Sequence, residues 1–96
     1  MKNQESWKNF IKLCTQYNDV DELSQLFDLF LTIEEKENLA ARYLIIRAVL
    51  GEEITQREMS EQYHVSIAQV TRGSNALKII DPDFKQKLIA KLNETS

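Results

Sequence analysis

The stretch from Leu39 to Leu50 constrains the fold more than any other part of the chain, because its apolar side chains point in nearly every direction around a helix. These side chains belong to Leu39, Ala40, Tyr43, Leu44, Ile45, Ile46, Ala48, Val49 and Leu50. A helix that is apolar on all sides must be covered on all sides, and a chain of 96 residues has few other helices to cover it. We therefore expect a homodimer whose chains wrap around each other. The alternative is a central helix in a monomeric bundle.

The rest of the chain also favours helices. Two glycines and one proline leave little room for the turns of an all-β fold. Capping boxes, in which Glu or Gln follows a hydroxyl residue by three positions, begin three helices, at Thr32–Glu35, Thr55–Glu58 and Ser66–Gln69. Asp81 followed by Pro82 indicates a further start.

Two more helices are predicted ahead of these starts. The apolar residues that share a face of the first are Trp7, Phe10, Ile11, Cys14 and Tyr17, and those of the second are Leu23, Leu26, Phe27 and Phe30. The whole pattern predicts six helices and an all-α fold. We expect one domain over residues 1–96, with a helix-turn-helix at about residues 55–78 and a dimerisation core at about residues 5–51 and 82–93.

Charge and composition narrow the class of protein. The net charge of −3 argues against nucleic acid, but residues 1–41 carry four basic and eight acidic residues, whereas residues 42–78 carry five basic and four acidic ones. Charge close to the DNA decides steering, so this pattern permits DNA binding without indicating it. The polar start of the chain and the lack of an apolar run near the ~20 residues of a membrane span predict a cytoplasmic protein without membrane contact. Cys14 has no cysteine partner and is expected to be a buried apolar residue rather than a reactive thiol.

Residues Gln56 to Arg72 have the pattern of a helix-turn-helix. Met59, Tyr63, Val65 and Val70 would hold the pair of helices to the body, and the small residues Ser60 and Ala68 would let them cross closely. His64 stands where such turns commonly have glycine, so we expect a turn residue that tolerates positive φ rather than a metal ligand or a base. The chain has no second histidine and no Ser/His/Asp set, and we expect neither an enzyme nor a metal site.

If this motif reads DNA, the first half of its second helix faces the base edges. The residues expected in the major groove are Ser66, Ile67, Ala68, Gln69 and Thr71. Ile67 and Ala68 could touch thymine methyl groups, and Gln69 and Thr71 could form hydrogen bonds. Gln56, Arg57 and Ser60 on the first helix would meet phosphates or a flanking base. The alternative for the polar residues is a solvated helix face.

Several segments together resemble the bacterial tryptophan repressor family. They are Leu31–Thr32, Arg42, "TQRE" at Thr55–Glu58 and "TRGSNALK" at Thr71–Lys78, and the likeness covers about residues 5–92. The resemblance implies an intertwined homodimer that binds L-tryptophan as corepressor and then double-stranded operator DNA. Such a protein represses genes for tryptophan synthesis or uptake.

The resemblance also implies a corepressor site made of Leu29, Leu31, Arg42, Ile46, Arg72 and Gly73. Arg42 would pair with the carboxylate of tryptophan, and Arg72 would stack on the indole. Leu29 and Leu31 of the second chain would offer carbonyl groups to the ammonium. Ile46 would line the floor, and Gly73 would leave room for the indole. The alternative is that Gly73 permits close helix packing and that Arg72 is a surface charge.

The resemblance also bears on two further points, the contacts to the DNA backbone and the surroundings of the amino group of tryptophan. Thr32, Lys36 and Lys78 would lie near the DNA backbone. The family often has a serine near the amino group of tryptophan, where this chain has Ala76. One hydrogen bond, typically worth about 0.5–1.5 kcal/mol, is then missing, which predicts weaker tryptophan binding or a preference for an analogue.

Two other functions stay open on the sequence alone. A ligand-independent helix-turn-helix dimer would bind DNA through the same residues without a corepressor. A helical protein–protein adaptor would use the apolar stretch from Leu39 to Leu50 as its docking surface.

Overall fold

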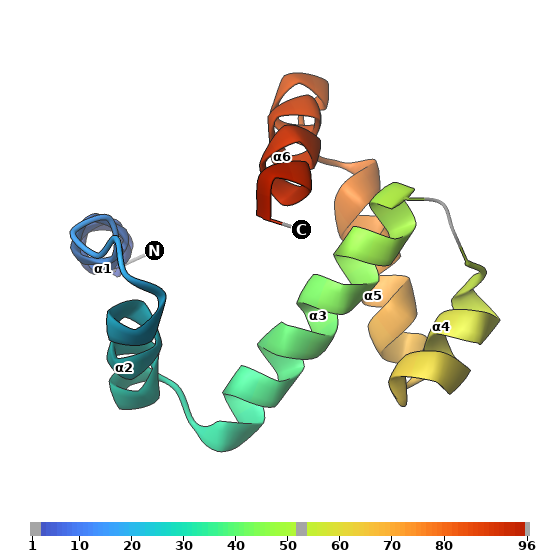
Figure 1. Cartoon of the computed structure of the whole chain (residues 1–96), viewed down its shortest axis with the longest axis horizontal. Coiled ribbons are helices and arrows are strands. Elements are labelled where there is room, and N and C mark those ends of the chain that lie inside the picture. Colours follow the sequence, from blue (N-terminus) through green and yellow to red (C-terminus); the bar gives the residue numbers. More distant parts are fainter. Residues whose placement is uncertain (1–2, 52–53, 96) are drawn as a thin grey trace. The chain divides into compact units, whose positions relative to one another are not determined.

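The computed structural model describes residues 3–51 and 54–95, which form helices and no strand (Figure 1). The helices are α1 (Gln4–Cys14), α2 (Val20–Phe30), α3 (Ile33–Gly51), α4 (Gln56–Tyr63), α5 (Ile67–Lys78) and α6 (Pro82–Thr95). The predicted all-α class and the six helices are confirmed over these residues. Two details were wrong, because α1 ends at Cys14 with Tyr17 beyond it, and Cys14 itself is half-buried rather than buried. Beyond that residue the amides of Gln16 and Tyr17 donate to carbonyls three residues back, at 3.0 and 3.2 Å, so the α-helical hydrogen-bond pattern ends there.

Side-chain caps explain where the helices begin. At α3, the Glu35 amide donates to the Thr32 hydroxyl at 3.0 Å and the Thr32 amide donates to the Glu35 carboxylate at 2.8 Å. Ser66 and Gln69 form the same reciprocal pair at α5. These bonds satisfy amides that have no partner within the helix, so two of the three predicted capping boxes are confirmed.

The caps of α4 and α6 are simpler. The Glu58 amide donates to the Thr55 hydroxyl at 3.1 Å, and that hydroxyl donates to the Glu58 carboxylate at 3.2 Å. Asp81 accepts from the Phe84 amide at 3.0 Å, with Pro82 as the first residue of α6. Both helices therefore begin at the predicted residues.

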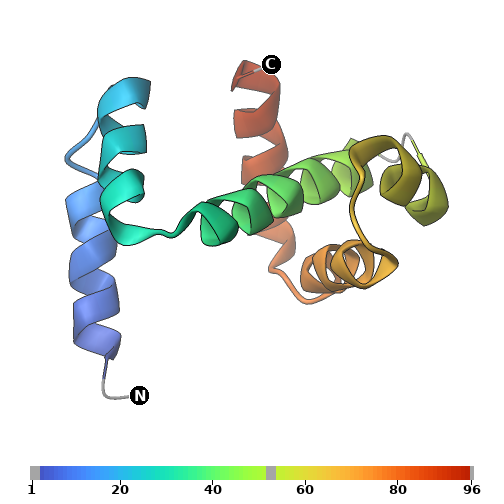
Figure 2. The same ribbon diagram turned by 90° about the horizontal axis from the view of Figure 1, so that it is seen from below.

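The chain divides into two compact units, the first ending at Lys36 and the second beginning at Glu37. In the first unit α1 and α2 lie side by side (Figure 2) and share an aromatic cluster. The Phe10 ring lies 4.9 Å from that of Phe30 and 6.1 Å from that of Phe27, centre to centre, both edge to face. Lys36 forms an ion pair with Asp28 on α2.

The core of the second unit lies where α3, α4 and α5 meet. Ile45, Met59 and Val70 come from these three helices and are almost completely buried. Ala48 and Val65 complete the cluster. Figures 1 and 2 both show α5 beside the C-terminal half of α3, so one face of α3 is covered by the helices that follow it.

Many large apolar side chains remain exposed in the single chain. On α3, Leu39 is 56% and Tyr43 is 49% exposed, and α1 has no buried residue. Other exposed apolar residues are Trp7, Leu29, Phe30, Ile33 and Leu44. The helix that is apolar all round is therefore covered on one face only by its own chain. Among the described residues, no helix has the length and apolarity that crossing a bilayer requires.

The turn between α4 and α5 is fastened by Ser60. His64 has φ 56° and ψ 42°, the left-handed conformation expected at this place. The Ser60 carbonyl accepts from the amides of His64 and Val65, and its hydroxyl donates to the Val65 carbonyl at 2.6 Å. The prediction of His64 as the left-handed turn residue is confirmed. Ser60 stabilises the turn by hydrogen bonds, in addition to being small enough for close helix packing.

We expect His64→Gly to stabilise the fold by about 0.5 kcal/mol, because relief from the left-handed strain of a non-glycine residue exceeds the entropy cost of glycine. The midpoint of thermal unfolding, compared at equal protein concentration, should rise by a few degrees. The matched control is Gln62→Gly, an exposed position within α4, which should cost about 1 kcal/mol. Equal losses in the two variants would show that the His64 side chain stabilises the turn.

Candidate functional site

The helix-turn-helix presents one face of α5 to solvent. Val70, Gly73 and Ser74 are buried against the rest of the second unit. The exposed residues of this helix are Ile67, Ala68, Thr71, Arg72, Asn75 and Lys78. The first two turns of α5 are thus free to meet another molecule.

Most of the residues predicted to contact DNA lie on the surface. Those that are exposed are Thr32, Gln56, Arg57, Ser66, Ile67, Ala68, Thr71 and Lys78, whereas Ser60 and Gln69 are half-buried. The polar atoms of Ser66 and Gln69 engage each other in the capping box, and the Ser60 hydroxyl is bound to Val65. These three side chains already have partners within the motif. Base contact by Gln69 would have to use its amide nitrogen, which the box leaves free.

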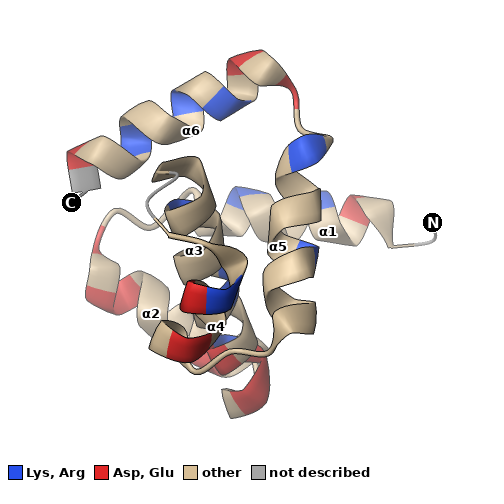
Figure 3. Cartoon of the chain, turned by 90° about the vertical axis from the view of Figure 1, so that its right-hand side faces the viewer, with Lys and Arg blue, Asp and Glu red and all other residues tan. Residues whose placement is uncertain are grey.

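The charges of the two helices differ (Figure 3). Helix α5 carries Arg72 and Lys78 and no acidic residue. On α4, Arg57 faces Glu61 at 3.4 Å (Nε to Oε1), and both side chains are highly exposed. An exposed pair of this kind contributes little to stability, so Arg57 can exchange Glu61 for a phosphate at small cost.

Gly73 marks the closest approach of α5 to α3. A Cβ atom at this position would lie 2.5 Å from Cγ2 of Ile45 and 3.4 Å from Cδ of Arg42. The first of these distances is too short for any real contact. Close helix packing therefore explains this glycine, and it brings Arg42 next to the same point of α5. A role of Gly73 in ligand binding stays a prediction.

The other residues predicted for the corepressor site lie on three helices. Ile46 and Arg42 are half-buried on α3, and Arg72 is exposed on α5 beside Gly73. Leu29 is 79% exposed on α2, and Leu31 is half-buried at the end of that helix. Arg42 and Gly73 thus lie together where α5 meets α3, and Arg72 precedes Gly73 on the exposed surface of α5. Leu29 and Leu31 belong to the first unit.

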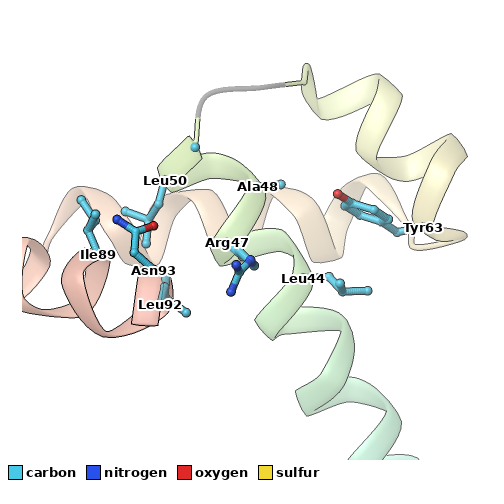
Figure 4. A pocket seen from close by; sticks show the side chains of 9 residues that line it. Leu44, Arg47, Ala48, Leu50, Tyr63, Ile89, Leu92 and Asn93 are labelled. Atoms are coloured by element: carbon cyan, nitrogen blue, oxygen red, sulfur yellow. The ribbon is translucent and has the colours of Figure 1, made fainter. Parts of the chain in front are cut away.

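A separate cavity of about 190 Å³ lies between α3 and α6 (Figure 4). Leu44, Arg47 and Tyr63 line it together with Ile89 and Asn93. The Arg47 guanidinium donates to the Tyr43 hydroxyl at 2.9 Å. None of the six residues predicted for the corepressor lines this cavity, so it is distinct from the predicted site.

Comparison with known proteins gives matches over most of the chain. The family model for "Trp repressor protein" matches residues 5–92. The chain belongs to the Trp repressor family. The "Trp operon repressor homolog" of Chlamydia trachomatis serovar D is 54% identical over 90 residues, which cover 92% of this chain and 96% of the relative. That of Chlamydia caviae is 50% identical over 86 residues, covering 90% and 85%.

A more distant relative extends the comparison. The "Trp operon repressor homolog" of Mannheimia succiniciproducens is 38% identical over 95 residues, covering 98% of this chain and 93% of the relative. The resemblance inferred from "TRGSNALK" is thereby confirmed. Trp repressors are transcription regulators and not enzymes, as the sequence had indicated.

Sequence reasoning missed one residue, Ile45, and one hydrogen bond of Ser60, a residue that it had predicted for its size and as a contact to DNA. Ile45 was assigned to the apolar stretch, yet it is the residue that faces Gly73. Its position three residues after Arg42 puts both on one side of α3, which is a signal that could have identified it. Ser60 was expected to matter for its size, and its hydrogen bond to Val65 depends on a turn whose carbonyl direction is not readable from sequence.

We expect Gly73→Ala to destabilise the protein by about 1–3 kcal/mol, because the added methyl overlaps a branched side chain in a packed core. Ile45→Leu removes the Cγ2 atom from that position, so the double variant should regain most of the loss. Urea unfolding measures both, with Asn75→Ala on the exposed face of α5 as the control. A Gly73→Ala protein as stable as the parent would contradict the close packing.

Proposed function

We propose that this protein is a tryptophan-dependent transcriptional repressor. It acts as a homodimer that binds L-tryptophan and then operator DNA, and it controls genes for tryptophan synthesis or uptake. Membership of the Trp repressor family supports this role, as do the names of the relatives. The observation that carries the ligand part is the approach of α5 to α3 at Gly73, which brings Arg42 to the helix that bears Arg72.

The two arginines suit the two ends of tryptophan. Arg42 is half-buried, and a guanidinium that is partly shielded from water binds a carboxylate strongly and often through two parallel hydrogen bonds. Arg72 is exposed on the adjacent helix, where its flat guanidinium can stack on an indole ring. Ile46 adds an apolar wall. Ala76, half-buried on α5, supplies no hydrogen bond to the ammonium group.

A second copy of the chain would complete the site and cover the exposed apolar residues. Leu29 and Leu31 flank Phe30 of the aromatic cluster of α1 and α2, and in the dimer their carbonyls would face the ligand of the partner subunit. The exposed faces of α3 and α1 supply the apolar surface that an obligate dimer buries. One chain alone leaves too much of it in water.

The proposed mechanism couples two sites. Tryptophan between α3 and α5 would change how far α5 stands from the body. In dimeric helix-turn-helix proteins, Trp repressors among them, the two reading helices enter successive major grooves about 34 Å apart. Tryptophan shifts the equilibrium only if it binds the DNA-competent arrangement more tightly than the other. The capped N-terminal half of α5 would then meet the bases through Ile67, Ala68 and Thr71.

One observation favours a second candidate, a dimer that binds DNA without a ligand. Ile45 fills the space beside Gly73, so α5 already packs closely on α3 at this point. In that case Arg42→Ala would leave DNA affinity unchanged. A protein–protein adaptor would differ from both, because its binding would be insensitive to salt, whereas contacts to several phosphates weaken steeply as salt rises.

We expect calorimetric titration of L-tryptophan to show one saturable site per chain. Arg42→Ala should weaken binding at least tenfold, because a hydrogen bond to a charged group is worth about 1.5–3 kcal/mol. Arg72→Ala should weaken it several-fold through the lost stacking. Lys91→Ala, on the exposed surface of α6, is the control and should bind like the parent. No heat up to millimolar tryptophan at several temperatures would contradict the corepressor site.

We also expect the protein to sediment at twice the chain mass of 11.2 kDa at micromolar concentration. Tyr43→Glu places a charge on the exposed apolar face of α3 and should shift the protein toward monomer. Glu34→Lys, on the exposed first turn of α3, is a charge-changing control that should remain dimeric. A monomeric parent protein would show that the exposed apolar side chains have another partner.

A further inference from the structure

A groove of about 860 Å³ lies on the second unit, beside the part of α5 that holds Ser74, Leu77 and Lys78. It is bounded by the last turns of α3, the start of α4, the second half of α5 and the start of α6. None of the residues predicted for the tryptophan site lines it. It shares only Gln56 and Lys78 with the predicted DNA-binding surface.

The floor of this groove is apolar. Val49, Met59 and Leu77 line it from three helices, and Met59 is almost completely buried. A concave apolar surface with a few polar groups around it is the usual form of a small-molecule site. The floor therefore suits a ligand with an apolar body.

Two lysines lie at the edge of this floor. Lys78 and Lys85 line the groove, and no Asp or Glu is among its described lining residues, although the chain as a whole has a net charge of −3. Within the part of the chain that the structure describes, neither lysine is in an ion pair. Two ammonium groups without counter-charges beside one groove favour an anion there.

A buried hydroxyl group is the third feature of the groove, after the apolar floor and the two lysines. Ser74 lines the groove and is only 8% exposed, and its Oγ atom has no hydrogen-bond partner. Buried polar groups nearly always have such a partner, so an unpaired one calls for an explanation. The Oγ atom itself is enclosed, so a polar atom of a ligand at the floor would pair with it once the Ser74 side chain turns toward the groove.

We propose that this groove is a second ligand site, which binds a small organic anion with an apolar, ring-sized body and a carboxylate. The carboxylate lies between Lys78 and Lys85, the body rests on Val49, Met59 and Leu77, and a polar atom of the ligand reaches Ser74. The same charges disfavour L-tryptophan itself, because its ammonium group would be repelled by the two lysines. The site is thus expected to select anions that lack an amino group.

The test is a titration of ¹⁵N-labelled full-length protein with sodium 2-naphthoate, followed through the amide resonances of Ser74, Leu77 and Gln86. The titration is run on the Arg42→Ala variant, in which the proposed tryptophan site is disabled. The result therefore does not depend on whether that site binds tryptophan in the parent protein. We expect saturable shifts of these resonances. 2-Naphthol, which has the same body without the carboxylate, and inorganic phosphate, which has charge without the body, should each bind at least fivefold more weakly.

Single-residue variants then test which side chains of the groove contact naphthoate. Lys85→Ala should weaken naphthoate at least fivefold, whereas Lys91→Ala, outside the groove, should leave it unchanged. Ser74→Ala should weaken naphthoate several-fold while the free protein unfolds at the same or a higher temperature, since only an unpaired hydroxyl is lost. Absent shifts up to millimolar naphthoate, shifts at Ile46 and Arg72 without shifts at Leu77 and Gln86, or equal binding of phosphate would each overturn the proposal.

Discussion

The packing of Gly73 on Ile45 is the contact on which the arrangement of the second unit depends. Only glycine lets the backbone of α5 lie so close to α3, since a Cβ would lie 2.5 Å from Cγ2 of Ile45. This contact fixes which face of α5 is buried and which is exposed. Ser60 then fastens the turn to α4, so the pair of helices is held as one body. The predicted DNA-reading residues and two residues of the predicted ligand site, Arg72 and Gly73, lie on this same helix.

The apolar surface that a single chain exposes connects dimerisation with tryptophan binding in the proposed mechanism. Helix α1 has no buried residue, and Leu29, Leu39 and Tyr43 are all about half exposed or more. A second copy would cover such surface and would also bring Leu29 and Leu31 to the site near Arg42. In the proposed dimer, residues of both chains would therefore form each ligand site.

Local features were predictable from the sequence, and tertiary ones were not. The caps at Thr32, Ser66 and Asp81 and the left-handed His64 were foreseen because each depends on a few neighbouring residues. Tyr17 was wrongly included in α1 because apolar spacing continues past the residue where the hydrogen bonds end. The partner of Gly73 and the unpaired hydroxyl of Ser74 depend on how helices cross. Spacing along one helix cannot specify such a crossing.

The coupling of tryptophan to DNA is measured most directly by the anisotropy of labelled duplex DNA that the protein itself has selected from a random-sequence pool. Titrations are run with and without L-tryptophan at two salt concentrations. The proposed switch predicts that tryptophan tightens binding at least tenfold and that raising salt weakens it steeply through the phosphate contacts. Equal affinity with and without tryptophan would contradict the switch and leave a ligand-independent DNA-binding protein. Binding that does not respond to salt would contradict the DNA-reading surface itself.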